Sequence, residues 1–529
     1  MRYLRLDFPC PESFRVRRGA HVIDRPHDSW PLFSSKTDRG QVRRRTRRGA
    51  SARLAVLLSV LFLAISAFGR TEFSLRRESR VPEQGGAGFS IPAFAQDLPK
   101  TAPPVRRKRP WRAALEVFSL NVSIWSIDRF IMNQDYARIG PSTWASNFEH
   151  GFAFDPDTFA MNFLFHPYHG ANYFNCARSQ GLSFWASAPY AFGGSLMWEL
   201  FMEKQHPSIN DLIMTSTGGT YLGEMLYRLS SQVLDDTAVG GNRFWREAAA
   251  LFIDPARGLN RLLFGDAFRT SSVNRQLRAS IHGTLGLRPF FMAENATLTR
   301  LKFSPGLEFD FIYNSITQDQ SALSPFDLFF LNTAFRFTGG KLAFNLDSYA
   351  LLVGKEYRTA SGQRHMIGLF QNYDFVSNEI IHMGGTSLAA GLQSVYPLGR
   401  GAQFRVTAQL GAVLFGASNN RYTHIEDRDY NYGLGSMSKV EAWLSHPTVG
   451  TLLFHFSHHQ IYTIKAAAFK ANVSQDFLTN VSARYGLLLS KKVGFRVEYT
   501  LFNRNLHFQG RPSYRTALSL IGASVFFVY

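Results

Sequence analysis

From Leu277 to Tyr529 the chain alternates apolar and polar residues in short segments separated by glycine, proline, asparagine and aspartate. A period of two residues is typical of β-strands whose two faces meet different surroundings. In residues 307–313, Leu, Phe, Phe and Tyr fall on one face, and Glu308 and Asp310 fall on the other. About twelve such segments are predicted, each near the ~10 residues that cross a membrane as a tilted strand.

The last segment, Tyr514–Tyr529, distinguishes between two all-β folds. It places Ile521 and Val525 on one face and ends on an aromatic residue, like the C-terminal signal that the barrel-assembly machinery reads. With an even strand number, this predicts a mainly β fold, an outer-membrane antiparallel β-barrel with an inserted helical segment. A secreted all-β sandwich is the alternative, but it does not account for 48 phenylalanines.

Residues 1–69 form a basic leader around a 15-residue apolar run at residues 54–68. The run follows an arginine-rich stretch and is short for a membrane-spanning helix, so an export signal is predicted and an uncleaved anchor is the alternative. Small residues in cleavage-like spacing end at Gly69 or at Ala95, and the sequence does not separate these two sites. Residues 70–110 are predicted to be a linker rich in proline and arginine.

The net charge of +19 is concentrated near the N-terminus. Residues 1–112 carry 24 Lys and Arg against 9 Asp and Glu, whereas the remainder carries 34 against 30. A nucleic-acid partner is therefore not expected. Cys10 lies in the leader, which leaves Cys176 alone and excludes an internal disulfide in a processed chain. No cofactor is predicted, and the oligomeric state stays open.

Residues 111–270 change to helical spacing and are predicted to form a separate domain before the barrel domain of residues 271–529. The expected elements are a segment of either type at 115–130, a hairpin at 147–166 turning at Asp155-Pro156-Asp157, and helices at 170–204, 208–234 and 244–264. If the hairpin joins the barrel, the strand number rises from 12 to 14. Residues 181–198 carry no charge, but Pro189 favours a buried helix over a membrane span.

Three stretches of this domain carry a family resemblance: NFLFHPYHGANYFNCARSQG from Asn162, SAPYAFGGSLMWE from Ser187, and PSINDLIMTSTGGTYLGE from Pro207. They resemble the uncharacterised bacterial family catalogued as domain of unknown function 3943, over residues 115–275. The motif residues are Asn162, Pro167, Gly170, Arg178, Glu199, Asn210, Gly219, Gly223 and Glu224. The resemblance implies a helical domain joined to a barrel-like part, and it leaves the activity of the protein open.

Histidines mark one candidate site. His166 and His169 lie three residues apart before a helix, and His150 would come near them if the hairpin folds back. These residues could form a metal site or provide a general base. The alternative is a structural strand-to-helix turn, in which Pro167 fixes φ and the imidazoles bond backbone carbonyls.

A second candidate is hydrolytic. Ser208, a histidine and Asn210 or Asp211 could form a Ser-His-Asx group. The competing interpretation is a helix cap, in which Ser208 accepts from the Asp211 amide. Glu199 and Glu224 could be a catalytic pair, but pairing with Arg178 and Arg228 in a buried cluster is the favoured expectation.

Other signals are read structurally. Gly219 and Gly223 form a GxxxG pair, which predicts close helix packing more often than dimerisation. His455 and His459 share one face of a predicted strand, where polar residues facing the lumen are the default in a barrel.

Three functions remain open from sequence. The favoured one is an exported protein that forms an outer-membrane barrel and binds or passes an envelope lipid or small molecule. Its helices are expected to form a plug or a periplasmic domain. The alternatives are an envelope hydrolase acting on lipid or peptidoglycan, and a structural scaffold without a ligand. The expected partners are outer-membrane lipid and the barrel-assembly machinery, contacted through the strand ending at Tyr529.

Overall fold

The computed structural model describes residues 108–528 except 278, 295–301, 315–322, 339–340, 424–425, 427 and 465–472. The predicted leader, most of the predicted linker and Tyr529 lie outside this part.

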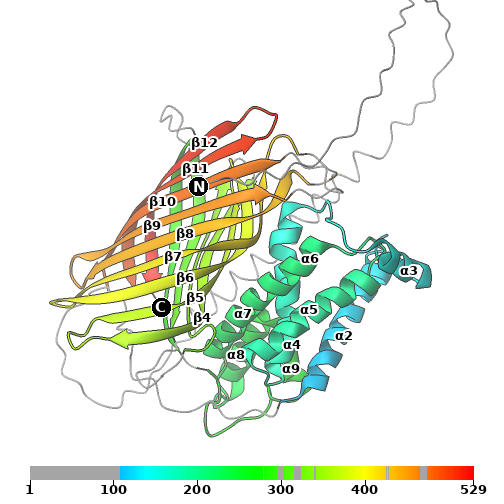
Figure 1. Cartoon of the computed structure of the whole chain (residues 1–529). Coiled ribbons are helices and arrows are strands. Elements are labelled where there is room, and N and C mark those ends of the chain that lie inside the picture. Colours follow the sequence, from blue (N-terminus) through cyan, green and yellow to red (C-terminus); the bar gives the residue numbers. More distant parts are fainter. Residues whose placement is uncertain are drawn as a thin grey trace, which may run out of the picture. The chain divides into compact units, whose positions relative to one another are not determined.

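The described chain begins with helices and continues as strands (Figure 1). The helices are α2 (Pro110–Ser126), α3 (Pro141–His150), α4 (His166–Ser179), α5 (Phe184–Phe201), α6 (Ile209–Ile213), α7 (Gly219–Val233), α8 (Gly240–Ile253) and α9 (Pro255–Leu263), with π-helical turns η1 (Ile127–Ile131), η2 (Met161–Phe165) and η3 (Met214–Gly218).

In the described chain twelve antiparallel strands close into a barrel, in which each strand pairs with its sequence neighbours and β1 pairs with β12. This confirms the predicted fold with twelve strands. The strands are β1 (Ser280–Glu294), β2 (Lys302–Asn314), β3 (Leu328–Thr338), β4 (Lys341–Arg358), β5 (Arg364–Ser377), β6 (His382–Gly399), β7 (Ala402–Asn419), β8 (Tyr430–His446), β9 (Gly450–Thr463), β10 (Ser474–Leu488), β11 (Val493–Phe508) and β12 (Tyr514–Val528).

The predicted hairpin at 147–166 is wrong, and so is the option of fourteen strands. Pro141 at the first position of α3 starts a helix that includes residues 147–150, and Gly151, at φ +68°, lies directly after its end. Asn147 is buried and donates to backbone carbonyls at the end of α5 and beyond it, at 3.1 to 3.4 Å. The alternating phenylalanines that suggested strands therefore belong to a helix, a loop and η2.

Two other helix predictions change in detail. Residues 115–130 are helical, in α2 and η1. The single helix expected over 170–204 is two helices, because Gly181 adopts φ +82° after α4 and Ser183 caps α5 by accepting from the Ala186 amide. No described helix is long and apolar enough to cross a membrane.

The two faces of each strand separate as the alternation predicts. On β11, Phe495, Val497 and Tyr499 point outward and are 43 to 44% exposed. Arg496 points inward and reaches Glu308 at 3.0 Å and Asp310 at 2.7 Å across the barrel. The outer wall is therefore apolar and the inner wall is charged but paired.

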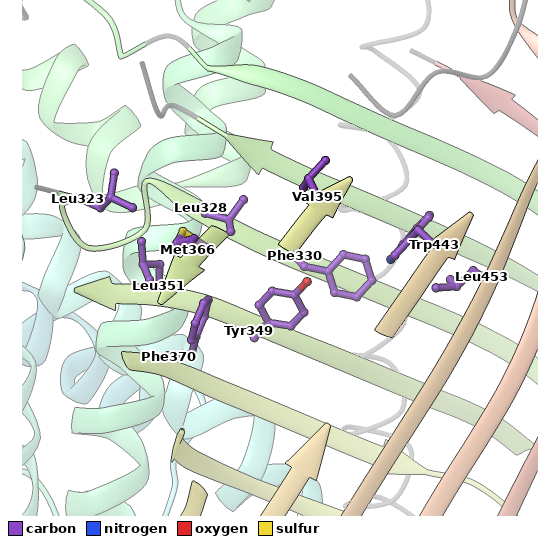
Figure 2. Close-up of a cluster of buried hydrophobic side chains, with 10 residues drawn as sticks. All are labelled: Leu323, Leu328, Phe330, Tyr349, Leu351, Met366, Phe370, Val395, Trp443 and Leu453. Carbon is purple, nitrogen blue, oxygen red and sulfur yellow. The ribbon is translucent and has the colours of Figure 1, made fainter. Parts of the chain in front are cut away.

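Apolar side chains also enter the lumen. Figure 2 shows a buried cluster that includes Phe330, Tyr349, Phe370 and Trp443. Ion pairs fill much of the remaining interior, and a cavity of about 100 Å³ lies among them, lined by Asp374, His455 and other inward residues. Side chains of the barrel itself therefore occupy its lumen.

Helices α4 and α7 cross at two glycines. A Cβ atom on Gly170 would lie 1.8 Å from the Thr215 carbonyl oxygen, and one on Gly219 would lie 2.6 Å from the Gly170 backbone. Gly223 faces the Phe174 ring, which a Cβ atom would approach to 2.8 Å. The GxxxG pair thus serves close packing between two helices of one chain.

The Gly170→Ala substitution should destabilise the helical domain, because the new methyl group must push the two backbones apart. Overpacking of this kind costs about 1–3 kcal/mol. Thermal unfolding followed by circular dichroism at 222 nm measures the loss. Gly193→Ala in α5 is the matched control, because nothing lies within 4 Å of its Cβ position, and it should be neutral or slightly stabilising. Equal melting temperatures for the two variants would contradict the close crossing.

Candidate functional site

The helices contact the outer wall of the barrel. Asn372 and Asp374 on β5 point into the lumen, where Asp374 accepts from Lys439 at 2.6 Å, so Tyr373 between them points outward. The Tyr373 hydroxyl donates to the carbonyl of Phe163 in η2. Gln371, also outward, donates to the Thr217 carbonyl at 3.2 Å. The contacts described here therefore lie outside the lumen, whereas a plug, which is one of the two expected placements beside a periplasmic domain, would lie inside it.

An arginine-carboxylate cluster fastens α4 and α7 to this wall. Glu224 is fully buried and accepts from Arg178 at 2.6 and 3.0 Å and from Arg228 at 2.8 Å. Arg228 also lies 3.2 Å from Asp327, before β3, and donates to the Pro325 carbonyl. The motif residues Arg178 and Glu224 thus belong to a structural lock between the helices and the barrel.

A second polar cluster lies near the ends of β5 to β8. Asp155, in the loop before η2, accepts from the Asn210 amide at 2.8 Å and from the Asn162 amide at 3.2 Å. Asn162 also lies 2.6 and 2.7 Å from the hydroxyls of Tyr430 and Tyr432, two outward residues at the start of β8. We call Asp155, Asn162, His166, Asn210, Asp211, Tyr430 and Tyr432 the polar seam.

His166 and Asp211 complete the seam. The His166 Nε2 atom lies 3.2 Å from Asp211 Oδ1, without the alignment of a hydrogen bond, and this carboxylate also accepts from Asn210 at 2.9 Å. The His166 side chain is 17% exposed and Asp155 is half-buried, whereas the His166 Nε2 atom and the other five members of the seam are buried. Asn162 is fully buried, and its Oδ1 atom has no hydrogen-bond partner among the described residues.

Several carboxyl groups crowd the seam. Burial, followed by the charges of Asp155 and Glu199, raises the pKa of Asp211 well above its usual range. Burial and the charge of Glu199 do the same to the pKa of Glu203, in the loop after α5. In both groups burial favours the protonated form, which can donate a hydrogen bond as well as accept one.

The other candidate residues lie apart from this arrangement. His169 packs against Tyr173 and Trp198, with ring centroids 4.6 and 5.4 Å away. His150 is exposed and stacks on His206 at 4.4 Å. Within the described residues, no three His, Cys, Asp or Glu side chains are grouped to hold a metal ion. The expected histidine metal site is not assembled.

Ser208 is used as a helix cap. Its Oγ atom accepts from the Asp211 amide at 3.2 Å, and its own amide donates to Glu199 at 2.7 Å. The expected arginine partner of Glu199 is therefore replaced by a backbone amide. Since the Ser208 hydroxyl is buried and serves α6, the structure does not present it as a nucleophile.

Histidines on β9 join a network in the lumen. His455 Nε2 lies 3.0 Å from Asp347, and His459 Nε2 lies 3.0 Å from Asp374. Lys439 bridges the same two aspartates at 2.8 and 2.6 Å. These side chains face inward, as the strand pattern predicts, and they neutralise one another.

Sequence reasoning missed three members of the seam. It treated Asp155 as a turn residue of a hairpin, and it did not single out Tyr430 or Tyr432. The available signal was the YNYG segment, which places two hydroxyls on the outward face of a strand that should otherwise be apolar.

The Glu203→Gln substitution should stabilise the helical domain more at pH 8 than at pH 5. The folded state raises the pKa of Glu203 above its usual value of 4.5. At pH values between the unfolded-state pKa and the folded-state pKa, folding takes up a proton, so the free energy of unfolding falls as the pH rises. Glutamine removes this loss, and melting temperatures at the two pH values measure it. Glu149→Gln, at an exposed position, should leave the pH trend unchanged, and the same trend in both variants would contradict the assignment.

Solved structures of barrel proteins match this chain at low similarity. An anion-selective porin from Comamonas acidovorans is 8% identical, with 48% of this chain and 100% of that chain covered and a TM-score of 0.20. The β domain of the Bordetella autotransporter BrkA is 9% identical, with 47% and 100% covered and a TM-score of 0.21. No curated protein matches. The barrel assignment rests on the strand pairing of this chain.

The family comparison concerns the helices. Residues 151–256 match the model of a family described as "Domain of unknown function (DUF3943)". This range contains η2 and α4 to α8, with most of the polar seam and the Arg178–Glu224 lock. The chain thus joins a DUF3943 segment to a closed twelve-stranded β-barrel.

Proposed function

We propose that this protein lies in the outer membrane and binds an envelope lipid at the polar seam, with its lumen closed to diffusion. The observation that carries the proposal is the position of the seam. Tyr430 and Tyr432 are outward residues of the barrel, on the side where a membrane barrel meets lipid. Carboxyl and amide groups of the helical segment cover them there, and the side chains of His166 and Asp155 are partly exposed at the edge of this contact.

The chemistry of the seam suggests the kind of head group. The seam and its neighbours Glu199 and Glu203 contain four carboxyl groups, and Arg428, which donates to the Asp155 carbonyl at 3.1 Å, lies at the edge. A cluster rich in carboxyl groups favours an ammonium or hydroxyl group over a phosphate, because these groups donate hydrogen bonds to carboxyl oxygens, whereas a phosphate offers mainly acceptors. Phosphatidylethanolamine combines such a head group with acyl chains, so it is the probe of choice.

The seam should retain phosphatidylethanolamine in native mass spectrometry of the protein in detergent with added dioleoyl lipids. Asp211→Asn should weaken retention roughly tenfold, since it replaces one of the two carboxyl oxygens that can accept from the charged ammonium group, and a hydrogen bond to a charged group contributes about 1.5–3 kcal/mol. The matched control is Asp135→Asn, an exposed aspartate that pairs with Lys204. Equal loss in both variants, or equal retention of phosphatidylglycerol by the unsubstituted protein, would exclude this head-group site.

The closed lumen leads to a separate prediction. In planar bilayers the full chain should give no steady conductance, because Arg484 and Arg496 bridge to Glu308 and Asp310 across the interior. Replacing Arg484 and Glu308 together by alanine should open measurable conductance, whereas the outward Val497→Ala change should not. A stable channel in the unsubstituted protein would contradict the closed lumen and would indicate that the protein passes molecules through its barrel.

A hydrolase is the second candidate. His166 Nε2 lies 3.2 Å from Asp211 Oδ1, so a small side-chain rotation would let Asp211 orient the imidazole as a base. A water molecule would then be the nucleophile, because Ser208 serves as a cap. Release of fatty acid from phosphatidylethanolamine vesicles, abolished by His166→Ala and kept by His150→Ala, would favour this function over binding alone.

A further inference from the structure

We propose that the outward face of the helical layer, α2 to α9, contacts lipid acyl chains, so that the layer lies beside the barrel in the same bilayer. This inference does not depend on a ligand at the polar seam. It follows from the distribution of charge over the helices, from their exposed apolar side chains and from the barrel surface that they adjoin.

Four of the helices in this layer have their charges inside. In α4, α5, α7 and α9 every charged side chain is buried or nearly so. Arg257 donates to the Tyr227 carbonyl and to Ser230, and Arg261 pairs with Glu247 at 2.6 Å and with Asp236 at 3.0 Å. A helical domain surrounded by water normally shows the reverse pattern, with charges on its outer face.

Large apolar side chains occupy the outer face instead. Trp111, Leu115 and Phe118 follow one another along α2 at helical spacing and are 52 to 64% exposed. Phe192 on α5 is 48% exposed, and Leu263 on α9 is 76% exposed. The prediction of a buried helix over 181–198 is therefore wrong for one side of α5. So much exposed apolar surface identifies a partner that is itself apolar.

The outer surface of the barrel indicates that this partner is lipid, because the exposed helix faces adjoin the apolar outer wall of the barrel. On β5, Ile367 and Leu369 are exposed, and the next outward residues, Gln371 and Tyr373, are covered by helices. On β8 the exposed Leu434 follows the covered Tyr432 in the same way. Lipid that contacts Leu369 and Leu434 must meet the helices at the edge of this covered strip.

Tryptophans mark the limits of the layer. Trp111 and Trp185 are exposed in the first turns of α2 and α5, and Trp245 is exposed in α8. Trp144 is exposed in α3 and donates to the Phe201 carbonyl at the other end of α5. Tryptophan near both ends of α5 is the distribution seen at the two interfaces of a membrane.

Spin labels can test the layer in the full chain. Cysteine replaces Phe192 or Leu262 on the outward helix faces, in a background with Cys10→Ala and Cys176→Ala, and the labelled protein is reconstituted in dioleoylphosphatidylcholine vesicles. Collision with oxygen, which concentrates in acyl chains, is compared with collision with a water-soluble nickel chelate. Leu434→Cys on the barrel wall is the lipid reference, and Lys204→Cys in an exposed loop is the aqueous reference.

We expect labels at positions 192 and 262 to match position 434, with an oxygen-to-nickel ratio severalfold above that at position 204. Nickel accessibility equal to that of position 204 would overturn the proposal, because the face would lie in water. Protection from both reagents would also overturn it, because protein would cover the face. Since the cysteine variants could fail to fold, the unsubstituted protein provides a second measurement: brominated phosphatidylcholine should quench its tryptophan fluorescence strongly, and weak quenching would equally overturn the proposal.

Discussion

Closure of the barrel depends on charges that neutralise one another across its lumen. Glu308 and Asp310 on β2 meet Arg484 on β10 and Arg496 on β11, so the network joins strands from both ends of the barrel sequence. Removing one member would leave a buried charge unpaired, at a cost of about 3–5 kcal/mol. The same alternation that directs these groups inward presents apolar side chains outward, so that one pattern determines both the filled interior and the lipid-facing wall.

The helices pair polar side chains on the outer wall of the barrel, as the ion pairs do in its lumen. They pack on outward barrel residues, yet several of those residues are polar: Gln371, Tyr373, Tyr430 and Tyr432. Hydroxyl and amide groups exposed to acyl chains would remain unsatisfied, and that is costly in a medium without water. The carbonyls of Phe163, Thr217 and Asp157 accept from the first three residues instead, and the Asp155 side chain accepts from Tyr432. The covered strip of the barrel is therefore built for the helices.

The strands could be predicted from sequence because a period of two residues is local, and Glu308, Asp310, His455 and His459 face inward as the pattern indicates. The hairpin at 147–166 was wrong because its phenylalanines alternate locally but pack on distant residues, as Phe159 does on Phe375. The seam was only partly predictable for the same reason. Asp155 gains its role from Tyr432, 277 positions away, and no local spacing reports that contact.

The position of the seam connects the two halves of the molecule. Arg178, Glu224 and Arg228 lock α4 and α7 to the chain before β3, whereas Asn162 and Asp155 meet the start of β8. The DUF3943 helices are thus attached to the outer wall at two separated places, and the intervening glycine crossing keeps α4 and α7 close together. A group held in the seam would touch barrel tyrosines and helix side chains at once. Binding there would act on the junction of the two parts, whereas the paired charges of the lumen would stay in place.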